Sequence, residues 1–436
     1  MLLKFDCCEH SEIKKHNFDD VELKQFNELF ESKKSDEYTK YLGIHQEFDG
    51  FEVKLKTHYF IGYRWLDDKS YIHVSPKKYN GYKADYLNMF LTCLKDPIVS
   101  KHLDETYKIF FNEKWIEIED TEDEITPFLI LQFLQIVNKI SKKGLKKGYI
   151  KVTENLTSKI KGKILINQTI KQNHFKNRPE KTVCTHQIFT TNCIENQILK
   201  TALLQCSRNL HGMKNEEINK LLKLNLNSFE LVDNTTVSQS DFLKVQHSAF
   251  YKEYKQALQL AQMIFKRFGF SLSSSINQTK NKIPPFYINM PELFERYVEV
   301  KLRKIYSNDL ISGYGMGNGY KTTIGELRPD FIVKSKKLII DAKYKYWFIN
   351  DSNKYFKDDF QQLSLYGRVK EIRDSIEVNE NEEATLLFIY PTTDNEKEFI
   401  ESSFENENNF YNIKKFAIKI PIHPNFTIIS SHKDMI

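Results

Sequence analysis

The sequence has no long hydrophobic run, since no apolar stretch approaches the roughly 20 residues needed to cross a bilayer. The first residues, Met1–Asp6, lack the apolar core of a signal peptide. The six cysteines form no C-x-x-C pair and no regular framework, which argues against a zinc site or a disulfide scaffold. We therefore expect reduced thiols, a cytoplasmic location and no membrane contact.

A nucleotide-binding P-loop is also missing. The glycine-rich run 313–319 is not closed by Gly-Lys-Ser/Thr, and it leads into predicted strands rather than into a helix N-terminus. We expect a flexible connection at this run. The sequence therefore predicts that this polypeptide does not itself hydrolyse nucleotides.

Length and charge set broad limits. A chain of 436 residues suggests two or three domains with sizeable cores. The net charge of +6, from 64 basic and 58 acidic side chains, is compatible with a polyanionic partner. It is weak evidence for one, because lysine-rich faces are usually just solvated.

The most informative stretch reads as two short apolar strands, 328–333 and 338–344, joined by the turn 334–337. Asp330 starts the first strand, and Asp341 and Lys343 lie near the end of the second. Side chains two apart on a strand share a face, and a hairpin brings Asp330 beside them. Two carboxylates and one ammonium can hold Mg²⁺ with a cation next to it, the outline of a phosphodiester-cleaving centre. An ordinary hairpin with exposed charges is the alternative.

Two flanking helices favour the nuclease interpretation. A helix begins at Pro291, a residue suited to the first helical turn, and Glu295 lies at the edge of its apolar stripe. A second helix, 358–373, places Gln362 and Tyr366 one turn apart on one face. The predicted apolar stripe of the first helix consists of Phe294, Tyr297, Val298, Leu302 and Ile305.

Periodicity predicts the remaining elements. The expected strands cover 51–55, 71–74, 109–111, 115–118, 161–166, 386–391 and 416–422. The expected helices cover 127–143, 194–203 and 250–268, with a loop at 171–182 facing solvent or DNA and a linker at 271–282. The predicted fold is mixed α/β: a β-rich N-terminal part, a helical middle and a C-terminal core with a mixed sheet flanked by helices.

The order of these motifs resembles the PD-(D/E)xK nuclease superfamily, and within it the McrC family, the nuclease subunit of McrBC-type modification-dependent restriction systems. The segments that carry the resemblance are 72–77 (IHVSPK), 144–149 (GLKKGY), 160–164 (IKGKI), 195–200 (ENQILK), 294–295 (FE) and the run from Asp330 through Gln362 and Tyr366. They span about 70 to 370, and residues 1–50 resemble nothing familiar.

The resemblance implies a partner and a division of labour. It implies an Mg²⁺-dependent DNA endonuclease that docks on a ring of McrB-like AAA+ GTPase subunits and stimulates their hydrolysis. The partner, not this chain, would bind GTP or ATP and recognise modified double-stranded DNA. The expected domains are 1–165 for docking, 166–280 as a helical connection and 281–436 as the PD-(D/E)xK endonuclease.

The resemblance also implies roles for single residues. Asp330 and Asp341 would bind Mg²⁺, helped by the carbonyl of Ala342 and by Glu295. Lys343 would hold or deprotonate a water, or stabilise the transition state electrostatically.

Other roles at this site stay open. Gln362 and Tyr366 would orient Lys343 or a DNA phosphate, with a buried polar pair that braces a helix as the alternative. Arg328 either contacts a phosphate or forms a salt bridge with Glu326 or Asp330. Lys345 is expected to be only the next position on the same strand face.

Two other functions remain as alternatives at this stage. One is a standalone restriction or repair nuclease, which would cut without partner or nucleotide. The other is a non-catalytic activator of an AAA+ NTPase, against which the intact Asp330, Asp341 and Lys343 argue.

Overall fold

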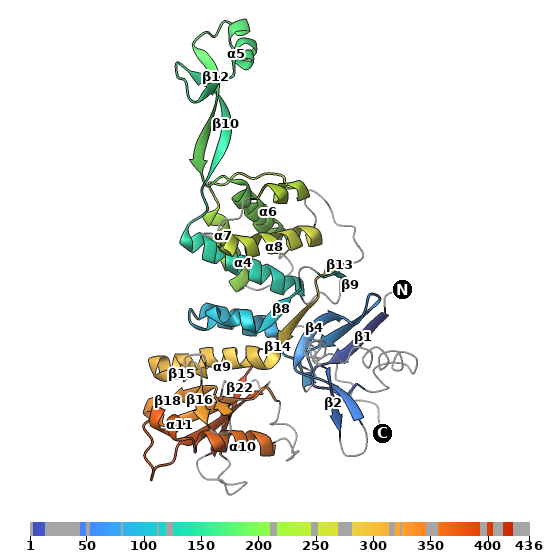
Figure 1. Cartoon of the computed structure of the whole chain (residues 1–436), viewed down its shortest axis with the longest axis vertical. Coiled ribbons are helices and arrows are strands. Elements are labelled where there is room, and N and C mark those ends of the chain that lie inside the picture. The colour runs from blue at the N-terminus through green and yellow to red at the C-terminus, as the bar shows by residue number, and fades with distance from the viewer. Residues whose placement is uncertain are drawn as a thin grey trace. The chain divides into compact units, whose positions relative to one another are not determined.

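The computed structural model describes residues 3–13, 44–48, 53–79, 82–110, 113–118, 125–209, 216–245, 252–268, 281–313, 319–322, 325–345, 356–392, 399–403 and 413–421. The chain forms two compact units, one of Met1–Ile116 with Pro284–Ile436 and one of Glu117–Ile283 (Figure 1). The elements confirm a mixed α/β chain. The limits of the units differ from the three consecutive domains predicted from the sequence, because the first and last parts of the chain share one unit.

The first unit contains a five-stranded sheet in the order β1-β5-β4-β14-β8. Its strands are β1 (Leu3–Cys8), β4 (Phe60–Trp65), β5 (Ser70–Ser75), β8 (Tyr107–Ile109) and β14 (Phe286–Asn289). β1 and β5 pair in parallel, while β14 pairs antiparallel with both β4 and β8. The sheet therefore combines strands from both ends of the sequence, which no local pattern reveals.

One glycine is essential where β4 meets β14. Gly62 has φ +137°, and a Cβ atom there would lie 2.3 Å from the backbone oxygen of Phe286. Only glycine combines this backbone conformation with so close an approach.

The first unit also contains smaller elements. They are the hairpins β2 (Ile44–Phe48) with β3 (Val53–Thr57) and β6 (Lys78–Tyr79) with β7 (Tyr82–Lys83), and helix α3 (Tyr86–Lys95). Single 3₁₀ turns cover Val99–Lys101, Leu103–Glu105 and Ser307–Asp309. Helix α3 packs on α9 (Met290–Tyr306), which begins directly where β14 ends. Asn289 caps α9 by accepting a hydrogen bond from the Glu292 N–H.

A six-stranded mixed sheet also belongs to this unit, with the strand order β15-β18-β19-β20-β22-β21. The strands are β15 (Leu310–Ser312), β18 (Phe331–Val333), β19 (Leu338–Ala342), β20 (Thr385–Thr392), β21 (Phe399–Ser403) and β22 (Ile413–Lys419). β19 and β22 both run parallel to β20. The continuous apolar run in β20 is buried, which confirms the predicted central strand.

A short hairpin and two helices accompany this sheet: β16 (Tyr320–Thr322) with β17 (Gly325–Leu327), α10 (Phe356–Tyr366) and α11 (Lys370–Ser375). The single helix predicted over 358–373 is wrong, because α10 ends at Tyr366 and α11 begins at Lys370. Gly367 follows the first helix, and glycine is a poor helix former. A Cβ atom there would lie 3.1 Å from Leu386, so this turn packs closely on β20.

In the described residues of the second unit, four helices of more than ten residues pack together, as expected for the middle of the chain. They are α4 (Ile125–Lys143), α6 (Ile194–Asn209), α7 (Glu216–Ser228) and α8 (Lys252–Phe268). α8 packs on both α4 and α6, and a 3₁₀ segment covers Gln239–Lys244. β9 (Ile116–Ile118) and β13 (Asn281–Ile283) pair with each other, where the chain enters and leaves the second unit. In the described ranges, no helix is long and apolar enough to span a membrane.

The second unit also carries a long two-stranded ribbon, drawn in green in Figure 1. β10 (Gly148–Thr157) and β12 (Lys181–Thr190) pair antiparallel over their whole length. β11 (Lys163–Ile164), α5 (Ile166–Gln172) and a 3₁₀ turn (His174–Lys176) form its tip. The strand predicted at 161–166 is confirmed only at Lys163–Ile164. The loop predicted at 171–182 overlaps the end of α5 and the start of β12, but its middle, 173–180, consists of mostly exposed turns, as expected. The linker predicted at 271–282 and the glycine-rich run 313–319 fall mostly outside the described residues.

Candidate active site

The hairpin of β18 and β19 brings the predicted acids together. Phe331 pairs with Ile340, so Asp330, just before β18, lies beside the end of β19. The Ala342 N–H donates to Asp330 Oδ2 at 2.7 Å. Lys337 closes the turn in the left-handed conformation, with its N–H bonded to the Lys334 carbonyl. This confirms the predicted hairpin and its turn.

Asp341 and Lys343 form the centre of the site. Asp341 is only 1% exposed, and its Oδ2 lies 2.7 Å from Lys343 Nζ. Burial raises the pKa of Asp341, although the Lys343 charge opposes this. Burial acts to lower the pKa of Lys343, but the charge and hydrogen bond of Asp341, with the charges of Asp330 and Asp359, together outweigh it, and the pKa is raised. The ammonium form of Lys343 is therefore stabilised beside the acids.

Helix α10 holds the lysine from the other side. Lys343 Nζ donates to Gln362 Oε1 at 2.9 Å, and Gln362 Nε2 donates to the Tyr366 hydroxyl at 2.7 Å. The Tyr366 hydroxyl then donates to the Arg328 carbonyl at 3.2 Å, two residues before Asp330. Burial, followed by the Asp341 charge, raises the pKa of Tyr366 to about 12. The predicted pair thus links the lysine to the strand that carries Asp330.

Glu295 lies on α9 within a cluster of charges that the sequence analysis missed. Its neighbour Arg296 has 0% exposure and donates to Glu292, Glu295 and Glu299 at 2.8–2.9 Å. Burial raises the pKa of Glu295 to about 7, with the Arg296 charge opposing it. The available signal was the spacing of Glu292 and Glu299, four residues before and three residues after Arg296. Arg296 therefore fixes the Glu295 carboxylate.

The three acids lie near enough to repel one another. Burial, then the charges of Asp341 and Glu295, raise the pKa of Asp330 well above its ordinary value. In the described part of the chain, no three His, Cys, Asp or Glu side chains form a metal cage by themselves. Mg²⁺ needs no such cage, since it commonly binds through one or two carboxylates and keeps several waters. The excess of buried negative charge at Asp330 and Asp341 fits a divalent cation.

Three further side chains have contacts or exposure that bear on their predicted roles. Lys345 does not continue the strand face, because β19 ends at Ala342 and Lys345 Nζ bonds both oxygens of the buried Asp359 at 2.8 and 2.9 Å. Arg328 pairs with Glu326 at 3.2 Å, one of its two expected salt bridges. On α9, Ile305 is 53% exposed and does not belong to the buried stripe, because it lies in the last helical turn.

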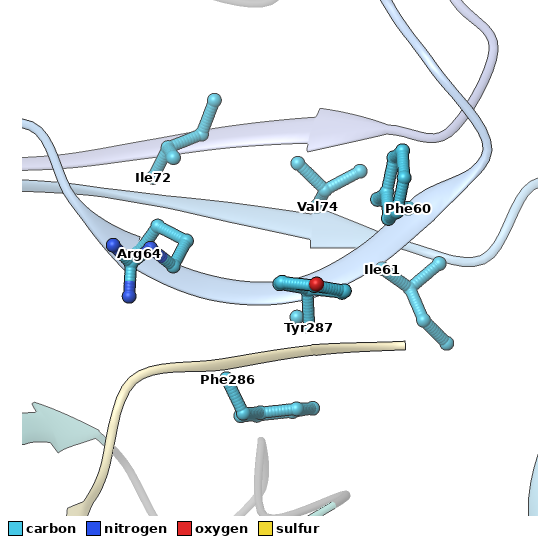
Figure 2. Close-up of a pocket in the computed structure, with 8 residues that line it drawn as sticks. Phe60, Ile61, Arg64, Ile72, Val74, Phe286 and Tyr287 are labelled. Carbon is cyan, nitrogen blue, oxygen red and sulfur yellow. The ribbon is translucent and has the colours of Figure 1, made fainter. Parts of the chain in front are cut away.

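A crevice in the first sheet is too small for a substrate. Figure 2 shows Arg64, Tyr287 and neighbouring apolar side chains around it. Its volume of about 10 Å³ is at the lower limit for a single water molecule. The Arg64 guanidinium lies 3.5 Å from the Phe110 ring centroid and bonds Glu113 at 3.1 Å, so it is held in the fold.

The fold and site define a mixed α/β protein with a cluster of acids and a lysine at the end of a hairpin strand. A family model described as "McrBC 5-methylcytosine restriction system component" matches residues 55–391. The chain belongs to this family. No curated protein matches it.

Two solved structures from Thermococcus gammatolerans are similar. A chain of the half-complex of McrB AAA+ hexamers with bound McrC is 15% identical, with a TM-score of 0.39, over 95% of this chain and 94% of that chain. A chain of the McrBC complex is 16% identical, with a TM-score of 0.32, over 69% of this chain and 87% of that one. The chain is assigned to its family by the family model alone, because the sequence identities and TM-scores of these two structures are low.

Proposed function

We propose that this chain is the Mg²⁺-dependent DNA endonuclease subunit of a McrBC-like restriction complex, with a PD-(D/E)xK core and a cytoplasmic location. The observation that supports it most is the position of Lys343. Its ammonium bonds Asp341 and Gln362, next to the hairpin in which Asp330 is fixed by the Ala342 N–H.

The residues that would hold the metal are Asp330, Asp341 and the carbonyl of Ala342, with Glu295 on the neighbouring helix. A bound Mg²⁺ would supply a more acidic water and offset the charge on the phosphate.

The protein groups have separate tasks in this proposal. Lys343 acts as a cation that holds the attacking water and stabilises negative charge on the phosphate, because its raised pKa makes it a poor base at neutral pH. Gln362 and Tyr366 hold that cation in place through their hydrogen bonds. Arg296, which is buried, holds the Glu295 carboxylate in place through an ion pair.

We further propose that the partner is a McrB-like AAA+ ring, which binds GTP or ATP and recognises modified double-stranded DNA. The McrBC family model that matches residues 55–391 supports this. The docking region predicted at 1–165 includes the start of the ribbon, where Tyr149 is 72% exposed. At the tip, Phe175 is 80% exposed among basic residues. Exposed aromatic side chains with basic neighbours are typical of a surface that binds another protein.

The test is plasmid cleavage with Mg²⁺, using methylated and unmethylated plasmid. Wild type is compared with Asp341→Asn, each alone and with the AAA+ partner plus GTP or ATP. Asp241→Asn is the matched control, because it removes an acid that pairs with Lys244 in the second unit. We expect cutting by wild type and by the control only with partner and nucleotide, and none by Asp341→Asn.

Other outcomes would change the proposal. Cutting by wild type without partner or nucleotide would indicate a standalone nuclease. No cutting, with equal stimulation of the partner's nucleotide hydrolysis by both proteins, would indicate a non-catalytic activator.

A further inference from the structure

The catalytic hairpin also contacts the N-terminal sheet, through the residue next to Lys343. The Tyr344 hydroxyl donates to Glu9 Oε1 at 3.1 Å across 335 positions of sequence. Glu9 is 1% exposed and Tyr344 is 4% exposed. A buried hydrogen bond between a phenol and a carboxyl group fixes both partners more strongly than a contact exposed to water.

Glu9 is itself fixed by the sheet. Its N–H donates to the Ser75 carbonyl at 2.9 Å, which extends the pairing of β1 with β5. The Lys77 N–H donates to the same Glu9 Oε1 at 3.2 Å. Because Glu9 is held through both its backbone and its side chain, its carboxyl group is a rigid acceptor for the Tyr344 hydroxyl.

The ring of Tyr344 joins two further parts of the same unit. It packs edge-on against Tyr59, with ring centroids 5.8 Å apart, and in a tilted arrangement against Phe294, with ring centroids 5.7 Å apart. Tyr59 is bound to the start of α9, since its carbonyl accepts from the Met290 N–H at 3.0 Å. Phe294 is the neighbour of Glu295 on that helix. Tyr344 therefore lies between the catalytic strand, the helix that carries Glu295, and the N-terminal sheet.

We propose that Glu9, acting through Tyr344, is a positioning residue that holds Lys343 at its working distance from Asp341. Lys343 and Tyr344 are consecutive, and their side chains bind different elements: α10 through Gln362, and the N-terminal sheet through Glu9. Fixing Tyr344 limits the movement of the chain just beyond β19. The inference rests on the proposed nuclease function, because it assigns a role to the geometry of that site.

The experiment measures Mg²⁺-dependent cleavage by the full chain with its AAA+ partner and nucleotide. Tyr344→Phe removes only the hydroxyl, Glu9→Ala removes the acceptor, and Glu9→Gln keeps an oxygen in its place. We expect kcat to fall on the order of tenfold in Tyr344→Phe and Glu9→Ala, with KM for DNA unchanged. Glu9→Gln should retain wild-type kcat. The double variant Tyr344→Phe/Glu9→Ala should be no slower than either single one, because both remove the same interaction.

A control variant tests whether the loss of any tyrosine–carboxylate hydrogen bond in this unit lowers kcat. Tyr107→Phe removes another tyrosine hydrogen bond to a carboxylate in this unit, to Asp104 Oδ1 at 3.3 Å. Because this bond is exposed, its loss should lower the melting temperature less than Tyr344→Phe does, and it should leave kcat unchanged well below melting.

Two results would overturn the inference while leaving the nuclease proposal intact. One is wild-type kcat in Tyr344→Phe. The other is an equal fall of kcat in Tyr107→Phe. Inactive wild type with partner, nucleotide and Mg²⁺ would instead overturn the nuclease proposal itself.

Discussion

Replacing Glu9 by glutamine should make the protein more stable at high pH. Burial raises the pKa of Glu9 from its ordinary 4.5 to about 7, although the Lys77 N–H and the Tyr344 hydroxyl oppose this. A carboxyl group with a raised pKa in the folded state contributes its full stability below about pH 4.5, and this stability is lost as pH rises through about 7. Each pKa unit corresponds to about 1.4 kcal/mol. Ionised Glu9 therefore costs the folded state on the order of 3 kcal/mol at pH 8.

The assay is urea unfolding of wild type and Glu9→Gln from pH 4.5 to 8. The two should have similar free energies of unfolding at pH 4.5, and Glu9→Gln should be more stable by about 3 kcal/mol at pH 8. Glu382→Gln serves as the control, because Glu382 pairs with Lys337 at the surface, which lowers its pKa. Its difference from wild type should have the opposite sign. A difference in the free energy of unfolding between wild type and Glu9→Gln that stays constant from pH 4.5 to 8 would refute the reasoning.

Three other predictions concern the site. Arg296→Met removes the buried cation that Glu292, Glu295 and Glu299 share and leaves Glu299 paired with Arg303 alone, so the free energy of unfolding in urea should fall by about 3–5 kcal/mol; a smaller change would mean that the acids become protonated at little cost. Gln362→Ala removes the acceptor of Lys343 Nζ, and kcat for plasmid cleavage should fall on the order of tenfold with KM unchanged. Mg²⁺ should raise the melting temperature of wild type but not that of Asp330→Asn/Asp341→Asn, because only a folded site binds it; an equal rise in both would place the ion elsewhere.

The sequence predicts the parts of the site that are local. Asp330, Asp341 and Lys343 lie in one hairpin, so strand alternation and a four-residue turn suffice to bring them together. Gln362 and Tyr366 are one helical turn apart, and their shared face follows from the helical period. Such features depend on residues close in the sequence.

The remaining features depend on distant partners or on a pattern that was overlooked. The hydrogen bond between Glu9 and Tyr344 joins residues 335 positions apart, and no periodicity indicates it. The pairing of β14 with β4 returns the chain to its first sheet after the whole second unit. By contrast, Ile150 and Val152 alternate with polar residues in β10, and this period of two could have predicted the first strand of the ribbon.

The two sides of the site are supported in different ways, and this decides which kinetic parameter should respond to each variant. Asp330 and Ala342 are held within the hairpin by one hydrogen bond, which does not involve the N-terminal sheet. Lys343 is held by Gln362 on one side and, through its neighbour Tyr344, by Glu9 on the other. Loss of the hydrogen bond between Tyr344 and Glu9 should therefore move the Lys343 ammonium, while Asp330 stays bonded to Ala342 within the hairpin. That is why kcat should fall in Tyr344→Phe while the Mg²⁺ concentration for half-maximal cleavage stays at its wild-type value.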